Sequence, residues 1–259
     1  MTASRRCVFC RGAGLTREHV VPDWLTAILP EQAEWRGHDR AVVVPSADGQ
    51  SRTVHLPHRE VRERFNAMTV KAVCRACNSG WMSELENQAK PAITAMVRGD
   101  PRRLGVRDTA AVARWAIKTA IVGHLTGAEV ADLASVAAVI KDSPGPPAGT
   151  WVWGGPVESD DWALRIETPT ALIAEAGEEL TIADACNTLM ATLGLGRLLL
   201  HVLVITRPSL RYPDLHEAFP SMVKLWPPTE ASITVWPPGP ALSGGMAWEV
   251  MQLPLWWFG

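Results

Sequence analysis

Residues 74–86 read Cys-Arg-Ala-Cys-Asn-Ser-Gly-Trp-Met-Ser-Glu-Leu-Glu, and the same Cys-x-x-Cys spacing occurs earlier, at Cys7 and Cys10. Two such pairs have the usual ligand spacing of a structural zinc site, in which each pair supplies two thiolates from one turn. Because 63 residues lie between Cys10 and Cys74, a local zinc finger is excluded. The sequence therefore predicts a zinc ion that joins two distant segments through Cys7, Cys10, Cys74 and Cys77.

Composition places this site in a globular protein. The chain has 259 residues, of which 47% are hydrophobic and 20% are charged, so it can bury a sizeable core and global disorder is excluded. No uncharged apolar run is long enough for a membrane span, and residues 1–7 carry arginines with no apolar run behind them. We therefore expect no membrane partner and a cytoplasmic protein, in which disulfides are rare.

Charge is distributed unevenly along the chain. The net charge is −2 overall, but residues 1–107 carry +6 and residues 108–259 carry −8. The basic part, which also contains the paired cysteines, favours a polyanionic partner, and the acidic part could contact a protein. We take Arg17, Arg62, Arg64 and Arg75 as candidate nucleic-acid contacts. The alternative interpretation is that these arginines only form a solvated surface.

Residue patterns predict an α+β fold. In the first part we expect a hairpin of strands 41–45 and 51–56, a strand at 70–74 and a helix that opens at Asn78. Apolar spacing predicts helices over 108–125, with Asp108 as N-cap, and over 129–141. After the Pro-rich segment 142–150 we expect strands at 151–153, 162–168, 189–192, 198–206, 232–236 and 247–253. These patterns divide the chain into domains at 1–107 and 108–259.

Two further residue groups carry chemistry. Glu18 and His19 follow the first cysteine pair, and Asn78 follows the second directly. Carboxylate and amide oxygens of Glu18 and Asn78 suit a hard divalent ion, and His19 could take a proton from water. Each residue also has an ordinary structural interpretation: a core histidine, a solvated carboxylate and a helix cap. Glu84 and Glu86 could add an acidic ligand, but a solvated helix face is the simpler interpretation.

Taken together, these motifs resemble the HNH endonuclease family. They are Cys-x-x-Cys, then Glu-His-x-x-Pro-x-Trp-Leu at 18–25, then Cys-x-x-Cys-Asn-x-Gly-Trp-Met-x-x-Leu-Glu at 74–86. The resemblance implies a ββα-metal (treble-clef) core over about residues 5–90, stabilised by zinc. It implies that Glu18 and Asn78 bind the catalytic metal and that His19 is the general base. The family's middle asparagine has its nearest counterpart in Asn66.

The leading hypothesis is thus a hydrolase, a metal-dependent endonuclease that cleaves DNA phosphodiester bonds with Mg²⁺ or Mn²⁺, RNA not being excluded. A second hypothesis is a zinc-stabilised nucleic-acid-binding or adaptor module without catalysis. A third is an enzyme with a small substrate held by the Trp-rich C-terminal half. The sequence alone leaves all three open.

Overall fold

The computed structural model describes residues 6–29, 40–45, 51–55, 68–126, 134–158, 164–167, 170–173, 188–205, 215–228 and 233–257. Its helical segments are α1 (Asp23–Thr26), α2 (Arg75–Cys77), the π-helical turn η2 (Asn78–Met82), α3 (Ser83–Arg98), α4 (Val106–His124), α5 (Ala134–Asp142), α7 (Leu215–Ala218) and α8 (Gly244–Trp257). Its strands are β1 (Leu15–His19), β2 (Arg40–Pro45), β3 (Ser51–His55), β4 (Thr69–Cys74), β5 (Arg102–Gly105), β6 (Thr150–Pro156), β7 (Leu164–Glu167), β8 (Thr170–Ile173), β9 (Thr188–Leu195), β10 (Leu198–Ile205), β11 (Val223–Trp226) and β12 (Ile233–Trp236). The fold is mixed α+β, as expected.

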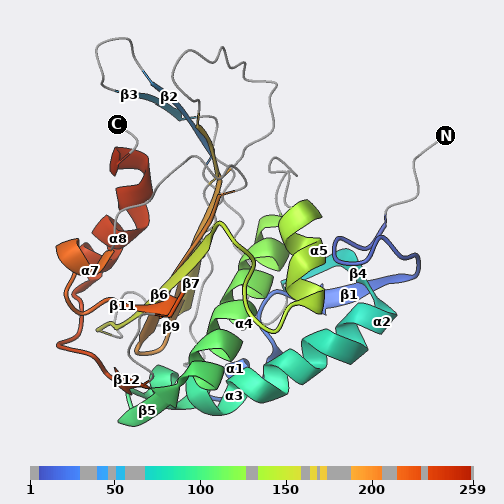
Figure 1. Ribbon diagram of the computed structural model, residues 1–259, viewed down its shortest axis with the longest axis horizontal. Coiled ribbons are helices and arrows are strands. Elements are labelled where there is room, and N and C mark those ends of the chain that lie inside the picture. Colours follow the sequence, from blue (N-terminus) through green and yellow to red (C-terminus); the bar gives the residue numbers. More distant parts are fainter. Residues whose placement is uncertain are drawn as a thin grey trace.

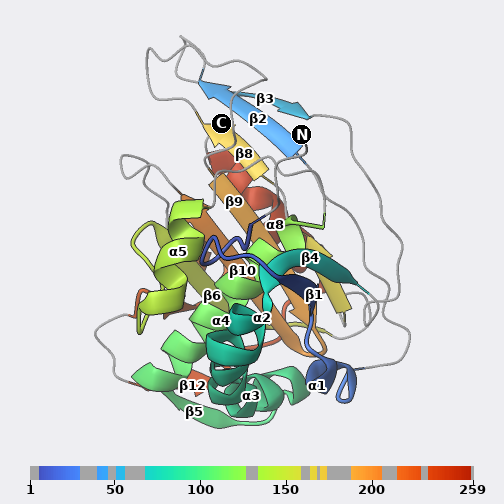
Figure 2. The same ribbon diagram turned by 90° about the vertical axis from the view of Figure 1, so that its right-hand side faces the viewer.

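The two cysteine pairs lie at one end of a small two-stranded sheet. Strands β1 and β4 pair antiparallel, with Leu15 opposite Cys74 and His19 opposite Thr69. The chain then runs from β4 through α2 and η2 into α3, whereas α1, β2 and β3 lie between β1 and β4 in the sequence. Figure 2 shows the paired strands β1 and β4, together with α2, in front of α4.

A larger sheet forms the other part of the molecule. Its strand order is β11-β6-β10-β9-β8-β2-β3, and β7 also pairs with β9. Among the described strands of this sheet, β2 and β8 run parallel and the other pairs are antiparallel. Strands β2 and β3, from the first part of the sequence, thus extend a sheet that is otherwise built from residues after 149.

Helices cover both faces of this sheet. Helix α4 lies on one face, and α7 and α8 lie on the other (Figure 1). Successive side chains of β10 point to opposite faces of the sheet and so contribute to the hydrophobic core on each face. Leu200 and Val202 pack with the residues of α4, whereas Leu199 and Leu203 pack with those of α7 and α8. All eight residues of β10 are buried, as expected for a strand between two apolar layers. Of the described helices, none combines the length and apolarity needed to cross a membrane.

Several predicted elements need correction. The strand predicted at 247–253 is wrong, because these residues lie in α8. The buried residues Ala247, Val250 and Met251 have the spacing of one helix face. Asp108 is the third residue of α4 rather than its N-cap: its Oδ2 accepts a hydrogen bond from the Gly105 N–H at 3.0 Å, so the helix begins at Val106.

A buried histidine in the sheet gives a pH-dependent prediction. His201 is fully buried, its Nδ1 lies 3.0 Å from Thr192 Oγ1, and burial lowers its pKa to about 3. Unfolding returns the pKa to about 6.5, so the unfolded chain binds more protons and stability falls as the pH drops from 6.5 towards 3. Between pH 6.5 and 4.5, we expect wild type to lose about 2 kcal/mol more than His201→Gln. Urea unfolding of both proteins measures this difference, and parallel curves would contradict it.

Candidate metal centre and the adjoining polar cluster

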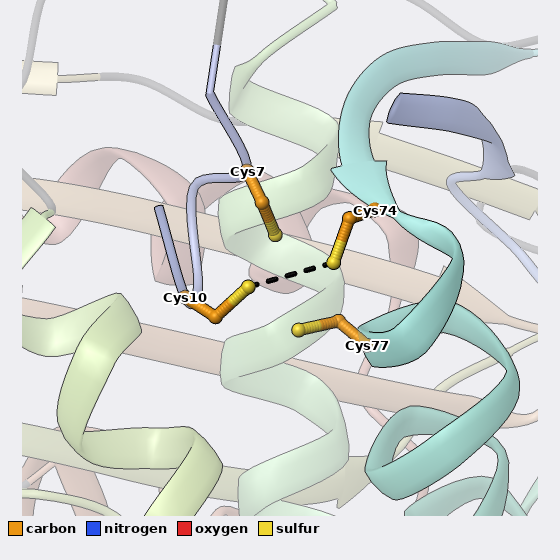
Figure 3. Close-up of side chains that lie close together, drawn as sticks. All are labelled: Cys7, Cys10, Cys74 and Cys77. Atoms are coloured by element: carbon orange, nitrogen blue, oxygen red, sulfur yellow. Dashed lines mark hydrogen bonds between the residues drawn. The ribbon is translucent and has the colours of Figure 1, made fainter. Parts of the chain in front are cut away.

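Four cysteine side chains converge between the first loop and the end of β4. The Sγ atoms of Cys7, Cys10, Cys74 and Cys77 all lie within 4.8 Å of one another. Figure 3 shows the four side chains pointing toward a common centre, with 3.4 Å between the sulfurs of Cys10 and Cys74. Tetrahedral zinc at about 2.3 Å from each sulfur requires sulfurs a little under 4 Å apart. The predicted ligands are thus brought together, and they could hold a zinc ion.

Backbone hydrogen bonds hold the two cysteine pairs in place. In the first loop the Cys7 N–H donates to Gly12 O, and the Arg11 N–H donates to Cys7 O. The Gly12 N–H points to the Cys10 sulfur, and a Cβ on Gly12 would lie only 3.1 Å from that sulfur. Glycine therefore permits the close approach of the loop backbone to the thiol. The two loops are also joined directly, by the Arg75 N–H to Gly14 O.

Burial and hydrogen bonding shift the pKa values of the thiols of Cys74 and Cys77 in opposite directions. Burial raises the pKa of Cys74, but a hydrogen bond with the Cys77 backbone and others from the neighbouring thiols outweigh it and lower the pKa to about 7. Burial raises the pKa of Cys77. Because zinc binds thiolates, it releases protons from such a cluster. Cys74, at the end of β4, is the thiol best prepared for deprotonation.

The predicted catalytic residues lie on β1 and on η2. Glu18 and His19 lie at the end of β1 that is remote from Cys74, and Asn78 lies at the start of η2. The Nδ2 of Asn78 donates to Thr16 Oγ1 and to the backbone oxygen of Arg17, both at 3.4 Å. Asn78 therefore lies against β1, directly before Glu18 and His19. The pairing register shifts between Thr16 and Glu18, and such irregularities re-aim side chains. Here Glu18 is buried, whereas 42% of the His19 side chain is exposed.

Glu18 takes part in a buried charge cluster. The ammonium of Lys118, on α4, lies 2.9 Å from Glu86 Oε1 and 3.9 Å from Glu18 Oε1. The Lys118 side chain is fully buried, and 9% of Glu18 is exposed. Burial raises the pKa of Glu18, the charge of Glu86 adds to this, and the charges of Lys118 and His19 oppose it. Two carboxylates against one ammonium leave the cluster with one formal negative charge.

The cluster corrects the interpretation of Glu86, which was expected on a solvated helix face. Glu86 is a hydrogen-bond acceptor for Lys118 instead, whereas Glu84 is exposed as expected. Sequence reasoning also missed Lys118. Its signal is a lone charge at an apolar position of a helix, between Trp115 and Val122. Its partners Glu18 and Glu86 are 100 and 32 residues away in the chain.

Removing the ammonium should destabilise the fold strongly. Lys118→Met leaves Glu18 and Glu86 without their cation in a buried site, and breaking one side of a buried ion pair typically costs about 3–5 kcal/mol. Lys71→Met removes an exposed lysine from β4 and should change stability by less than about 0.5 kcal/mol. Urea unfolding at neutral pH compares the two. Equal effects would show that Lys118 does not stabilise the pair of carboxylates.

The candidate nucleic-acid contacts divide into two groups. Arg17, on β1, and Arg75, at the start of α2, are both exposed; Arg17 accepts a hydrogen bond from Asn78 through its backbone oxygen, and Arg75 lies three residues before Asn78 in the chain. Arg62 and Arg64 lie outside the described residues, as does Asn66. The described part of the proposed basic surface is thus formed by β1 and α2.

Comparison with known proteins finds no matching family model, curated protein or solved structure. The assignment of function therefore depends on the motifs and on the geometry of this site.

Proposed function

We propose that the protein is a metal-dependent endonuclease of the HNH type, in which the zinc-stabilised hairpin and helix form a ββα-metal (treble-clef) core. The main support is the position of Asn78. Its contacts with Thr16 and Arg17 bring the helix start against the strand that carries Glu18 and His19. The HNH-like motifs are therefore adjacent in space although 58 residues separate His19 from Asn78.

The donor set near the end of β1 suits a hard divalent cation. Asn78 uses its Nδ2 within the protein, so its Oδ1 remains as a ligand atom. The Glu18–Glu86–Lys118 cluster carries a formal negative charge that a cation can neutralise. Glu18 and Asn78 would hold Mg²⁺ or Mn²⁺ through oxygen atoms, as these ions prefer. When bound, the cation stabilises charge on the phosphate and the leaving oxygen.

His19 is the proposed general base. Its half-exposed ring can meet water, and its Nδ1 faces the exposed carboxylate of Asp23, with 3.9 Å between Nδ1 and Oδ1. We propose that the imidazole proton lies on Nδ1, the nitrogen on the side of that carboxylate. Nε2 is then the atom that takes a proton from the attacking water. Arg17 and Arg75 would bind flanking phosphates and position the DNA.

The zinc ion would have a structural role only. Four thiolates fill a tetrahedral site and leave no position for water or substrate, which is the pattern of structural zinc. By joining Cys7 and Cys10 to Cys74 and Cys77, zinc would fix β1 relative to the start of α3. It would therefore set the distance between His19 and Asn78 without entering the reaction.

One observation favours the second candidate, a nucleic-acid-binding or adaptor module without catalysis. The buried ammonium of Lys118 already lies 3.9 Å from Glu18, so it competes with a metal ion for the negative charge of this carboxylate. In that module, Arg17 and Arg75 would still bind phosphates. The acidic residues after 107 would provide a surface for a protein partner in either case.

Cleavage of supercoiled plasmid tests the proposal. The zinc-loaded protein should nick the plasmid in Mg²⁺ or Mn²⁺ and should be inactive in EDTA or Ca²⁺. A mobility-shift assay on the same DNA separates the two candidates. Binding without nicking in any divalent metal would overturn the nuclease and support the binding module.

A further inference from the structure

A second candidate binding site lies away from β1. A cavity of about 630 Å³ opens between the first turns of α4, the segment after α5, and Trp226 of β11. Cavities that bind small molecules usually have volumes of about 300–1,000 Å³. Polar and aromatic side chains line part of its wall, and none of them takes part in the proposed nuclease chemistry.

Two arginines give the cavity an excess of positive charge. Arg114 is half-buried and uses one nitrogen, Nη2, to donate to Ile140 O at 2.9 Å. Its Nε is buried and has no hydrogen-bond partner in the described structure. Arg107, about two helical turns earlier on α4, also lines the cavity and is exposed. Neither arginine forms an ion pair with any described carboxylate.

The carboxylate in the wall is already neutralised. Asp108 accepts the hydrogen bond from the Gly105 N–H, and its Oδ1 lies 3.9 Å from Arg102 Nη2. The carboxylate of Asp108 therefore interacts with the N-terminus of α4 and with Arg102, which lies outside the cavity wall. Arg107 and Arg114 have no carboxylate partner among the described residues, so their charges are available to an anion, although Arg114 Nη2 also donates to Ile140 O.

An aromatic side chain, Trp226 of β11, also lines the cavity. The six-membered ring of Trp226 packs against Gly145, where even a Cβ atom would lie 2.6 Å from the ring edge. Glycine at 145 therefore allows the ring to take this position. Trp226 is only partly buried, so part of the indole is available to a flat ligand. Bases stack readily on such rings.

We propose that this cavity binds a nucleoside monophosphate. The phosphate, with nearly two negative charges, would pair with the two guanidinium groups, which favour planar, bidentate contacts with phosphate. The base would stack on Trp226. The site is separate from His19, so binding does not depend on the proposed nuclease activity. The ligand is either a free nucleotide or a nucleotide within a strand.

Calorimetric titration of the zinc-loaded full chain tests this. Each of the four ribonucleoside 5′-monophosphates, adenosine alone and inorganic phosphate alone are the probes. At least one monophosphate should bind more tightly than both adenosine and phosphate, because only it satisfies the arginines and the ring together. A dinucleotide that carries the base of the tightest-binding monophosphate distinguishes a free nucleotide from a nucleotide within a strand. Tighter binding of the dinucleotide than of the monophosphate indicates a strand, and weaker binding indicates the free nucleotide.

Two variants identify the site. Arg107→Gln removes an exposed charge and should weaken binding about tenfold or more. Ala110→Leu fills the cavity from a partly exposed helix position and should abolish binding. Arg98→Gln, an exposed arginine outside the cavity wall, is the matched control and should bind like wild type. Failure of all monophosphates to bind, or equal binding by Ala110→Leu and wild type, would overturn the proposal. Binding of inorganic phosphate or adenosine as tight as that of the best monophosphate would also overturn the proposal.

Discussion

Cys74→Ser is expected to lose its zinc and most of its thermal stability. Structural zinc sites contribute on the order of 10 kcal/mol of apparent binding energy near neutral pH. Here the ion would tie together two segments that the chain itself connects only through 63 residues. For a protein of this size, 1 kcal/mol shifts the melting temperature by about 2–4 °C. We therefore expect a decrease of at least about 10 °C, measured by circular dichroism, together with loss of zinc in elemental analysis.

Cys186→Ser is the matched control for this prediction. It removes the one cysteine that belongs to neither Cys-x-x-Cys pair, and it should retain one zinc per chain. Retention of a full equivalent of zinc by Cys74→Ser would contradict the four-cysteine site.

His19→Ala should reduce plasmid nicking by about 100- to 10,000-fold, the usual contribution of a general base. The ring is half-exposed, so its removal leaves no large cavity and should not change the fold. Zinc content and melting temperature should match those of wild type. The measurement is the initial rate of nicking in Mn²⁺ at equal protein concentration.

Asp23→Asn serves as the comparison. Its carboxylate faces His19 across 3.9 Å and is 79% exposed, so it should alter the rate by less than about tenfold. If His19→Ala nicks DNA as fast as wild type, the histidine is not the base and the activity arises elsewhere.

The clustering of Cys7, Cys10, Cys74 and Cys77 could be predicted from the sequence because the spacing within each pair is typical of zinc ligands. A Cys-x-x-Cys pair places two thiolates on one turn whatever surrounds it. The hairpin of β2 and β3 was predicted for a similar local reason, and the two strands pair as expected. The adjacency of Asn78 to β1 follows from the same two cysteine pairs, because they bring the two segments together.

The elements that were missed depend on contacts between distant residues. The strand predicted at 189–192 extends to Leu195, because Gly194 pairs with Leu199 in the sheet instead of ending the strand. Gly196 makes the turn, with a φ of 60°, and a Cβ there would lie 2.8 Å from Val97 O. That contact comes from α3 and is not visible in the local sequence.

The burial of Lys118 could not be predicted for the same reason. Lysine favours helices at exposed positions, and the cost of burying its charge is offset by Glu86 and Glu18, which tertiary structure brings together. The error at 247–253 has a different cause. Tryptophan and valine favour strands, but packing against β9 and β10 selects a helix.

We propose that Glu18 and Asn78 form a divalent-cation site beside a separate zinc site. The most direct test is a Mn²⁺ titration of the zinc-loaded protein, without DNA, followed by electron paramagnetic resonance. We expect one exchangeable Mn²⁺ per wild-type chain, lost in Asn78→Ala while the zinc remains. Absence of bound Mn²⁺ in wild type, or equal binding by Asn78→Ala, would contradict it.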